Sequence, residues 1–412
     1  MEKNEKVILR RFIAEDPNFK QEKVSSLLNR CLSQIIDNFE LYSCLYLSLK
    51  EEFREKVVAR LSPKIPICIS LPLIDCEKFW KRCSQEFFPY DYSKNYTGAK
   101  WKNFFCERFI TKLIKECKNF DFFDSHVEDL LKILSSHVHT LKLLNVRVSE
   151  ADHVTTWDNI IKSIETLKEL KIIVISYKIR ASFSDLNWEI EKISSKEFSK
   201  LVQTMKQHNL EVIKITTSKI NDENVRVLCD SLYTNKTLKV LDLSYNDITD
   251  IGIEYISNLI GNSQYIEKLH LVCNKISPYG CQLICDALGL NKNKVEDLNL
   301  RLNSIGDSGA TWIAKMLNKS KLLKKLNISS CRIGVEGGGS LIHSLEANKS
   351  LCFFDISNNF IGEKNGSKFV KLLINRDKKL QVDTRLCDFN TNDEKLINNK
   401  FFVADSISDE DY

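Results

Sequence analysis

The sequence predicts an α/β solenoid, with parallel strands on its concave face, helices on its convex face and a helical domain before it. Three observations lead to this prediction. In the second half of the chain, a short apolar motif recurs every 28 or 29 residues. In the first half, apolar residues recur instead at spacings of three and four, which is typical of helices. Glycine and proline divide the halves, since five of six prolines lie at or before Pro89 and twelve of thirteen glycines at or after Gly252.

The recurring motif is clearest at residues 238–248. The stretch LKVLDLSYNDI fits L-x-x-L-x-L-x-x-N-x-L, the consensus of leucine-rich repeats. Six copies occur, and their ninth positions are Ser218, Asn246, Asn274, Asn303, Cys331 and Asn359. A further step of 28 residues reaches Cys387, where Val382 and Phe389 stay in phase but the leucines are lost. That loss is expected of a terminal cap, so we predict a leucine-rich-repeat solenoid that ends there.

Each copy also predicts a helix. A glycine or asparagine stands six residues after the ninth position, except in the last complete copy, where Gly366 comes one residue late. Apolar pairs spaced by four follow it, and this spacing places both members on one helical face. The pairs are Leu228/Leu232, Ile256/Ile260, Ile284/Leu288, Ile313/Leu317, Leu341/Leu345 and Val370/Ile374. A period of 28–29 residues with a full helix resembles the ribonuclease-inhibitor subclass of these repeats.

Four regions follow from these patterns. We expect an N-terminal helical domain at 1–134, irregular leading repeats with an insertion at 135–205, ribonuclease-inhibitor-like repeats with a C-terminal cap at 206–395, and an acidic, disordered tail at 396–412. Helices are predicted over 17–60 and from Trp101 to Cys117. The leading repeats carry strand patterns near Leu141 and Leu170, and the segment at 182–190 breaks the period.

Composition excludes several classes of protein. The formal net charge of +5, from 60 basic and 55 acidic residues, is too small to predict nucleic-acid binding. The N-terminus has no signal-peptide pattern, and the apolar stretches at 65–74 and 172–175 are too short for a bilayer span. We therefore expect a soluble protein of the cytoplasm without membrane contact. Fourteen cysteines spread over so long a chain are expected to be free thiols.

Patterns that suggest chemistry each have a structural alternative. Cys281 and Cys285 are spaced as two zinc ligands on a helix, or as buried thiols, and no second pair completes a zinc site. Gly337–Gly339 follows a strand, as a phosphate loop does, yet it occupies the helix-start position of the repeat and predicts a tight turn. The asparagines of the ninth position are expected to satisfy backbone groups. We expect no enzyme, no catalytic residue, no metal and no cofactor.

The concave face is the candidate binding surface. The fifth positions of the motif are Lys214, Asp242, His270, Asn299, Asn327 and Asp355, and the seventh are Thr216, Ser244, Val272, Arg301, Ser329 and Ser357. These side chains are expected to point to solvent. They form neither the basic lane nor the aromatic row that nucleic acids need, and no small-molecule substrate is expected. The surface is either a merely solvated sheet or a protein-binding face, with Lys214, Asp242, His270, Asn299, Arg301, Asn327 and Asp355 as the candidates.

Further segments carry a resemblance to a known family. These are FWKRCSQ at 79–85, GAKWKNFFCER at 98–108, DLNWEI at 185–190, the unit at 216–232 and DTRLCDF at 383–389. Over roughly residues 15–395 they resemble the leucine-rich-repeat subunits of the nexin–dynein regulatory complex. The resemblance implies a structural subunit in the axoneme of motile cilia or flagella, part of the cytoskeleton. It implies that the chain links doublet microtubules and regulates dynein through contacts with other subunits and neighbouring axonemal proteins.

A second resemblance implies another function. W-K-R-C at 80–83 followed by W-K-x-x-F at 101–105 is similar to the helical segment of F-box and elongin-A-like proteins, which recruit substrates for ubiquitin transfer. The stretch at 61–66 lacks a clean adaptor-binding helix. In either case Trp80 and Trp101 are expected to share one helical core that packs against the first repeats.

Overall fold

The computed structural model describes residues 26–89, 100–116, 125–146, 157–177, 179–181, 188–190, 193–289, 293–376 and 378–402. The chain divides into two compact units, Met1–Lys102 and Asn103–Tyr412, and the division falls within helix α7 (Trp101–Glu116). The segment predicted as one helical domain, 1–134, is therefore shared between both units. The prediction of a disordered tail at 396–412 is wrong for its first residues, because 396–400 belong to the helix Thr391–Lys400 and Phe402 bridges to Val382. The tail after residue 402 lies outside the described residues. Among the described helices, none is both long and apolar enough to cross a bilayer.

The described part of the first unit is helical. It contains α2 (Leu27–Asp37), α3 (Phe39–Ser48), α4 (Glu51–Arg60), α5 (Ile67–Leu73), α6 (Glu77–Phe87) and the start of α7. The helical prediction over 17–60 is confirmed for three helices, with breaks at Asn38 and at Leu49–Lys50, while 17–25 lies outside the described residues. The helix predicted to start at Trp101 is confirmed as α7.

The W-K-R-C segment builds the core of the first unit. Trp80 is 1% exposed, its Nε1 donates to the Ile74 carbonyl oxygen at 3.0 Å, and its ring meets that of Phe79 edge to face at 5.3 Å. Arg82 Nη2 donates to the Val58 carbonyl oxygen at 2.5 Å, which satisfies a carbonyl in the last turn of α4. Trp101 is only half-buried and lies near the Lys81 ammonium, so the two tryptophans do not share one buried core as predicted.

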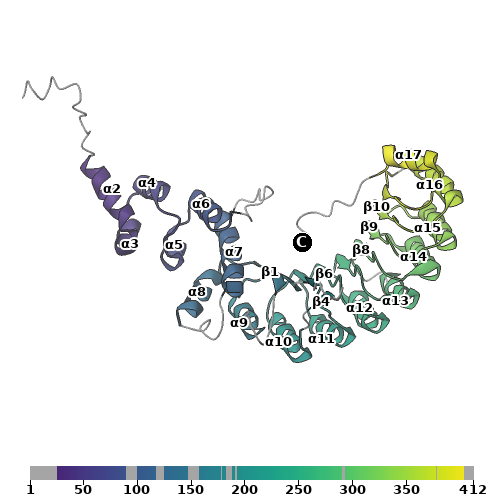
Figure 1. Ribbon diagram of the computed structural model, residues 1–412, viewed down its shortest axis with the longest axis horizontal. Coiled ribbons are helices and arrows are strands. Elements are labelled where there is room, and N and C mark those ends of the chain that lie inside the picture. Colours follow the sequence, from purple (N-terminus) through teal and green to yellow (C-terminus); the bar gives the residue numbers. More distant parts are fainter. Residues whose placement is uncertain are drawn as a thin grey trace, which may run out of the picture. The chain divides into compact units, whose positions relative to one another are not determined.

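The second unit is built on one parallel sheet. Its strands in spatial order are β1 (Thr140–Val146), β2 (Ile172–Tyr177), β5 (Val212–Thr216), β6 (Val240–Asp242), β7 (Lys268–His270), β8 (Asp297–Asn299), β9 (Lys325–Asn327), β10 (Phe353–Asp355) and β11 (Gln381–Asp383). Within this unit the strands line the inner side of an arc and the helices its outer side (Figure 1). The predicted solenoid, with strands concave and helices convex, is confirmed.

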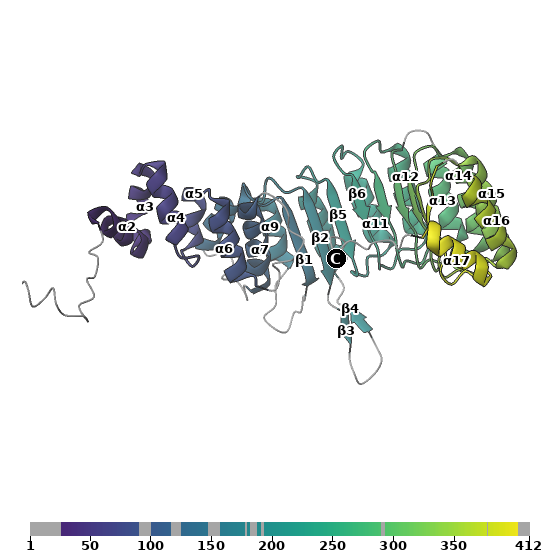
Figure 2. The ribbon, with the colours of Figure 1, turned by 90° about the horizontal axis from the view of Figure 1, so that it is seen from above.

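A helix follows each strand of the sheet. The helices of the unit after α7 are α8 (Ser125–Ser135), α9 (Trp157–Thr166), α10 (Ser195–Met205), α11 (Asp222–Leu232), α12 (Asp250–Asn262), α13 (Pro278–Gly289), α14 (Gly306–Lys319), α15 (Val335–Ala347), α16 (Glu363–Asn375) and α17 (Thr391–Lys400). The strands predicted near Leu141 and Leu170 are present as β1 and β2. The insertion forms an antiparallel pair, β3 (Ile179–Ala181) with β4 (Trp188–Ile190), which projects from the sheet (Figure 2).

The constant period places equivalent residues side by side. Leu269, Leu298 and Leu326 are direct partners on neighbouring strands, and each is 0% exposed. The cap continues this row, because Phe354 on β10 pairs with Val382 on β11. Burial of such side chains contributes roughly 25 cal/mol per Å² of apolar surface removed from water. The core of the unit is therefore a continuous apolar layer between sheet and helices.

The asparagines of the ninth position connect successive units. Asn303 Nδ2 donates to the carbonyl oxygens of Leu271 in the preceding unit, at 2.9 Å, and of Leu300 in its own, at 2.8 Å. Its Oδ1 accepts from the backbone N–H groups of Asn274 and Ile276, both at 3.2 Å. Asn246 and Asn359 repeat this pattern in their own units. The predicted structural role of the asparagines is confirmed, because one side chain satisfies four backbone groups.

Three units replace the asparagine and change the turn. Their ninth residues are Ser218, Cys331 and Cys387, and the residues that follow, Lys219, Arg332 and Asp388, have φ of 49°, 58° and 52°. The residues that follow the asparagines have no positive φ. Burial raises the pKa of Cys331 and of Cys387 to about 12, so each thiol stays protonated. The thiols donate to the carbonyl oxygens of Leu300 and Ile356, at 3.2 and 3.1 Å.

A thiol has no oxygen that can replace the asparagine Oδ1. In the two cysteine units a glycine of the preceding unit supplies a different bond: Gly306 N–H donates to the Cys331 carbonyl oxygen and Gly362 N–H to that of Cys387, both at 3.0 Å. These glycines have φ of 60° and 82°, a left-handed conformation that costs other residues about 1–2 kcal/mol. Each cysteine is thus matched to a glycine in the unit before it.

The helix-start glycines permit close packing of successive units. A Cβ on Gly337 would lie 2.6 Å from Asp307 Oδ1, and one on Gly252 would lie 2.6 Å from Asp222 Oδ1. Asp307 Oδ1 accepts from the N–H groups of Gly334 and Gly337, at 2.7 and 2.9 Å, and so caps the N-terminus of α15. The prediction of a tight turn at 337–339 is wrong, since these residues lie within α15 and none has a positive φ.

The last complete repeat corrects another prediction. The predicted inward-facing pair was Val370/Ile374, but Ile374 is 55% exposed. Phe369 and Leu373, each one residue before a member of that pair, are buried. Asn365, rather than the late Gly366, occupies the helix-start position, and its Nδ2 donates to the carbonyl oxygens of Val335 and Ile361 at 2.7 and 3.0 Å. The period of 28 is therefore unbroken at the helix as well as at the strand. The other apolar pairs are buried as predicted.

The stacked leucines make the unit sensitive to a buried charge. Leu298→Asp is expected to remove soluble folded protein, because an unpaired carboxylate in this layer costs several kcal/mol. Leu322→Asp is the control, since Leu322 is 41% exposed just before β9. Thermal unfolding of both variants measures the difference. Unchanged melting of Leu298→Asp would contradict the packing described.

The two tryptophans of the first unit are expected to contribute unequally to the free energy of unfolding. Trp80→Ala should lower the free energy of unfolding by about 3–5 kcal/mol, because a fully buried ring leaves a large cavity. Trp101→Ala should cost clearly less, since its ring is half-buried. Urea unfolding of both variants checks this order, and equal losses would argue against it.

The pairing of cysteine and glycine can also be tested. Gly306→Ala is expected to destabilise the protein by about 1–2 kcal/mol, because alanine is strained at a φ of 60°. Gly289→Ala is the matched control: no atom lies within 4 Å of its added Cβ, its φ is not positive, and it ends α13. The control is expected to leave stability unchanged or to raise it by a few tenths of a kcal/mol. Denaturant unfolding would contradict the role of Gly306 if both variants behaved alike.

Candidate protein-binding surface

Six consecutive strands, β5 to β10, carry six of the seven candidate residues, and Arg301 follows β8, but many of the side chains do not face solvent. Asp242, Asn327 and Asp355 are only 6–7% exposed. Lys214, His270, Asn299 and Arg301 are half-buried. The expectation that Asp355 and Arg301 both point to solvent is therefore wrong for Asp355. The sheet brings the candidates into two rows along its inner side, as the repeat predicted.

The buried members hold the backbone that leaves each strand. Asp355 Oδ1 accepts from the Ser357 N–H at 2.9 Å, and Asn327 Oδ1 accepts from the Ser329 N–H at 3.0 Å. Asp242 and Asn299 make the same bond two residues ahead, at 3.0 and 3.2 Å. These side chains form Asx turns, in which a short polar side chain replaces a backbone partner. Asn327 Nδ2 also donates to Asp355 Oδ2 at 2.9 Å and so joins two units.

His270 lies between two carboxylates on the same face. Its Nδ1 is 3.9 Å from Asp242 Oδ2, and its Nε2 is 3.5 Å from Asp297 Oδ1. The three side chains come from β6, β7 and β8, which are consecutive strands. Exposed Lys268 is the strand partner of Asp297, so charges of both signs meet on this part of the face.

Arg301 differs from its neighbours. Its Nε is buried and has no hydrogen-bond partner among the described residues, and its guanidinium forms no ion pair with them. Arginine is enriched among the residues that dominate binding energy at protein interfaces. The residue as a whole is only half-buried, so the terminal nitrogens of its guanidinium, rather than the buried Nε, are the groups that a partner's acceptor could reach.

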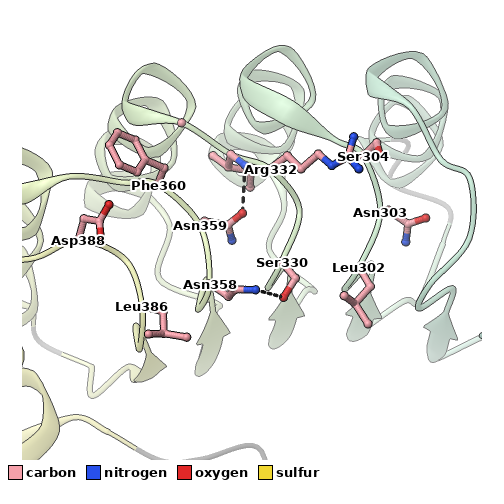
Figure 3. Close-up of a pocket in the computed structure, with 12 residues that line it drawn as sticks. Leu302, Asn303, Ser304, Ser330, Arg332, Asn358, Asn359, Phe360, Leu386 and Asp388 are labelled. Atoms are coloured by element: carbon pink, nitrogen blue, oxygen red, sulfur yellow. Dashed lines mark hydrogen bonds between the residues drawn. The ribbon is translucent and has the colours of Figure 1, made fainter.

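A hollow lies beside the concave face, along the loops that leave β8, β9, β10 and β11. Its volume is about 730 Å³, and Figure 3 shows Leu302, Ser330, Asn358 and Leu386 at the strand ends. These four are the eighth residues of their units, and each has a positive φ, for example 61° at Leu302. Asn358 Nδ2 donates to Ser330 Oγ at 2.9 Å across two units. The sequence pattern did not point to this hollow, because its residues belong to loops of variable composition.

The cysteine pair on α13 is part of the core. Cys281 and Cys285 are 0% and 3% exposed, and the Cys281 thiol donates to the Gly309 carbonyl oxygen at 3.6 Å. Its hydrogen bond with Cys285 and its burial raise the pKa of Cys281 well above the ordinary range. Among the described residues, no group of three histidine, cysteine or acidic side chains could hold a metal ion.

Sequence reasoning missed the aspartates that cap helices of the next unit. Besides Asp307, Asp222 accepts from Thr249 and Gly252 at the start of α12, and Asp250 accepts from Ser277 at the start of α13. A signal was present, because these three aspartates stand thirteenth in their units and are each followed 30 residues later by glycine. Helix starts favour negative charge, so they serve the fold rather than a ligand.

Comparison with known families identifies the repeats. A family model described as Leucine Rich repeat matches residues 234–257, 262–285, 291–314 and 319–341. These segments correspond to four consecutive units of the solenoid. Two solved structures are also similar. Leiomodin-1 actin-binding site 2 has a TM-score of 0.32 and 21% sequence identity, and the match covers 38% of this chain and 90% of that one. A plant ice-binding protein has a TM-score of 0.31 and 16% sequence identity, and the match covers 54% of this chain and 58% of that one. TM-scores this low carry no argument about the fold.

Curated relatives share a single name. Dynein regulatory complex subunit 5 of Macaca fascicularis, of Homo sapiens and of Mus musculus is 28% identical to this chain over 263 residues. The alignment covers 58% of this chain and 51%, 51% and 52% of the three relatives. The chain thus spans about half the length of the curated relatives it matches. It carries leucine-rich repeats and is similar to dynein regulatory complex subunit 5.

Proposed function

We propose that the chain is a non-enzymatic structural subunit of the nexin–dynein regulatory complex in the axoneme of motile cilia or flagella. The observation that carries the proposal is its similarity to dynein regulatory complex subunit 5, at 28% identity over 263 residues. In this role it links doublet microtubules and regulates dynein by holding other subunits and neighbouring axonemal proteins. A leucine-rich solenoid suits that task, because each unit adds surface without requiring a deep pocket.

The ubiquitin-ligase adaptor is not supported by the motif that suggested it. Trp80 and Cys83 are buried, and Arg82 donates to two carbonyl oxygens of the first unit. Trp80, Arg82 and Cys83 thus have structural roles, and Lys81 is the exposed member of the motif. We therefore propose the axonemal function alone.

The concave face is the proposed partner surface, with a narrower set of residues than the sequence suggested. Lys214, His270, Asn299 and Arg301 are partly accessible. Asp242, Asn327 and Asp355 have an indirect role, because they accept hydrogen bonds from the backbone and so fix the turns that leave the strands. Arg301 is the proposed anchor, since its half-buried guanidinium forms no ion pair with the described residues.

The position of the chain in the cell tests the proposed function. A tagged chain expressed in a ciliated cell is expected to stay in the axoneme after detergent extraction. A diffuse signal lost on extraction would contradict the axonemal proposal. Purification of the tagged chain should recover axonemal subunits, whereas recovery of a cullin adaptor would favour ubiquitin transfer.

Arg301→Ala is expected to reduce retention on demembranated axonemes by about tenfold, because an anchoring arginine contributes more than about 1–2 kcal/mol to binding. Lys371→Ala, at an exposed position on α16, is the control and should be retained like the unchanged chain. The measurement is immunoblotting of axonemes from cells that express only the variant. If Arg301→Ala were retained fully, the partner would bind another face, while the axonemal function would stand.

A further inference from the structure

The loops that lead from each helix into the next strand lie together at one edge of the sheet. This follows from the topology, because all nine strands are parallel and each helix runs back between two of them. Before β9, β10 and β11 these loops span 320–324, 348–352 and 376–380. Together with Lys319, the last residue of α14, they contain six lysines and a single acidic residue, Asp377, which lies outside the described residues. The edge of the last three strands is therefore basic.

Five of these lysines are exposed and form no ion pair with the described residues: Lys319, Lys321, Lys349, Lys378 and Lys379. We call these five the lysine edge. The sixth, Lys324, is paired with Glu296 at 2.6 Å.

The lysines are close in space as well as alike in exposure. Lys321 and Lys349 are 28 residues apart and thus equivalent, and Lys378 follows the next equivalent position by one residue. The strands that they precede are consecutive and in register, as Lys325, Phe353 and Gln381 are Cα partners. Neighbouring strands are about 4.8 Å apart, so the lysines form a short, continuous row.

Stabilisation of the fold does not account for this row. Lysines near helix C-termini favour the helix dipole, but only α14 has one in its last turn, Lys319, and α15 and α16 have none. At the same edge of earlier strands, Lys239 pairs with Glu211 at 2.8 Å, whereas Lys236 and Lys294 are exposed and form no ion pair with the described residues. Like charges placed side by side repel one another, so the row opposes folding slightly unless something acidic covers it.

We propose that the lysine edge binds an acidic segment of another protein, rich in glutamate and aspartate. Flexible lysine ammonium groups match a flexible row of carboxylates without demanding one geometry. Phosphate backbones are bound preferentially by arginine forks and by helix N-termini. Neither is available here, because Arg376 is buried on carbonyl oxygens of Leu345 and Leu351 and the helices present their C-termini. The three loops also contain no aromatic residue for base stacking.

The test uses the full chain and a fluorescein-labelled oligoglutamate peptide, followed by anisotropy at low and at physiological ionic strength. Lys321→Glu/Lys349→Glu/Lys378→Glu is expected to weaken binding about tenfold, since each exposed charge contributes modestly and three are reversed. Lys364→Glu/Lys368→Glu/Lys371→Glu, on exposed positions of α16, makes the same change in net charge. This matched control should bind nearly as the unchanged chain does, and thermal unfolding confirms that all three proteins are folded.

Equal weakening by both triple variants would overturn the proposal, because it would show a response to net charge alone. Tighter binding of single-stranded DNA than of the peptide, dependent on the same lysines, would assign the edge to nucleic acid instead. The acidic tail of this chain is a further competitor. If binding appeared only after replacement of Asp405, Asp409, Glu410 and Asp411 by their amides, the edge would be occupied by the tail. The proposal is independent of the axonemal function, which none of these outcomes contradicts.

Discussion

The hydrogen bonds of the ninth-position side chain connect one unit to the next, and the rest of the solenoid depends on them. A strand of three residues followed by a sharp loop leaves backbone groups that neither strand nor helix can satisfy. Asn303 satisfies four of them at once, two in its own or the preceding strand end and two in the preceding loop. Because a buried, unsatisfied backbone group costs about 1–3 kcal/mol, each asparagine contributes far more than its size suggests.

Where this residue changes, the surrounding geometry changes with it. A cysteine supplies a donor but no strong acceptor, and a second left-handed residue then turns the backbone carbonyl toward a glycine of the preceding unit. The aspartates that cap the next helix add a second connection between units, and glycine at the helix start leaves room for it. Stacking is therefore held by polar bonds at the loops and by apolar burial in the layer between sheet and helices.

These constraints decide which surfaces remain for partners. Much of the concave face is committed to the fold, because the short polar side chains at the fifth position bond to the backbone two residues ahead. Long side chains such as Arg301 extend past that layer and remain available. The edges of the sheet are less constrained, since their loops need only an apolar residue at fixed positions. Charge can therefore accumulate at an edge without disturbing the strands.

The sequence by itself determined the architecture, since a period of 28–29 residues dictates strand register, helix phase and the end of the array. It could not reveal which concave residues are accessible, because Asp355 and Arg301 occupy equivalent-looking positions and differ only in reach and in hydrogen bonding. Nor could it show that Asn365 replaces Gly366, or that Leu373 rather than Ile374 is buried, since both depend on how α16 packs. Tertiary structure decided these points, because burial and cross-unit bonds arise between residues about 30 positions apart that only stacking brings together.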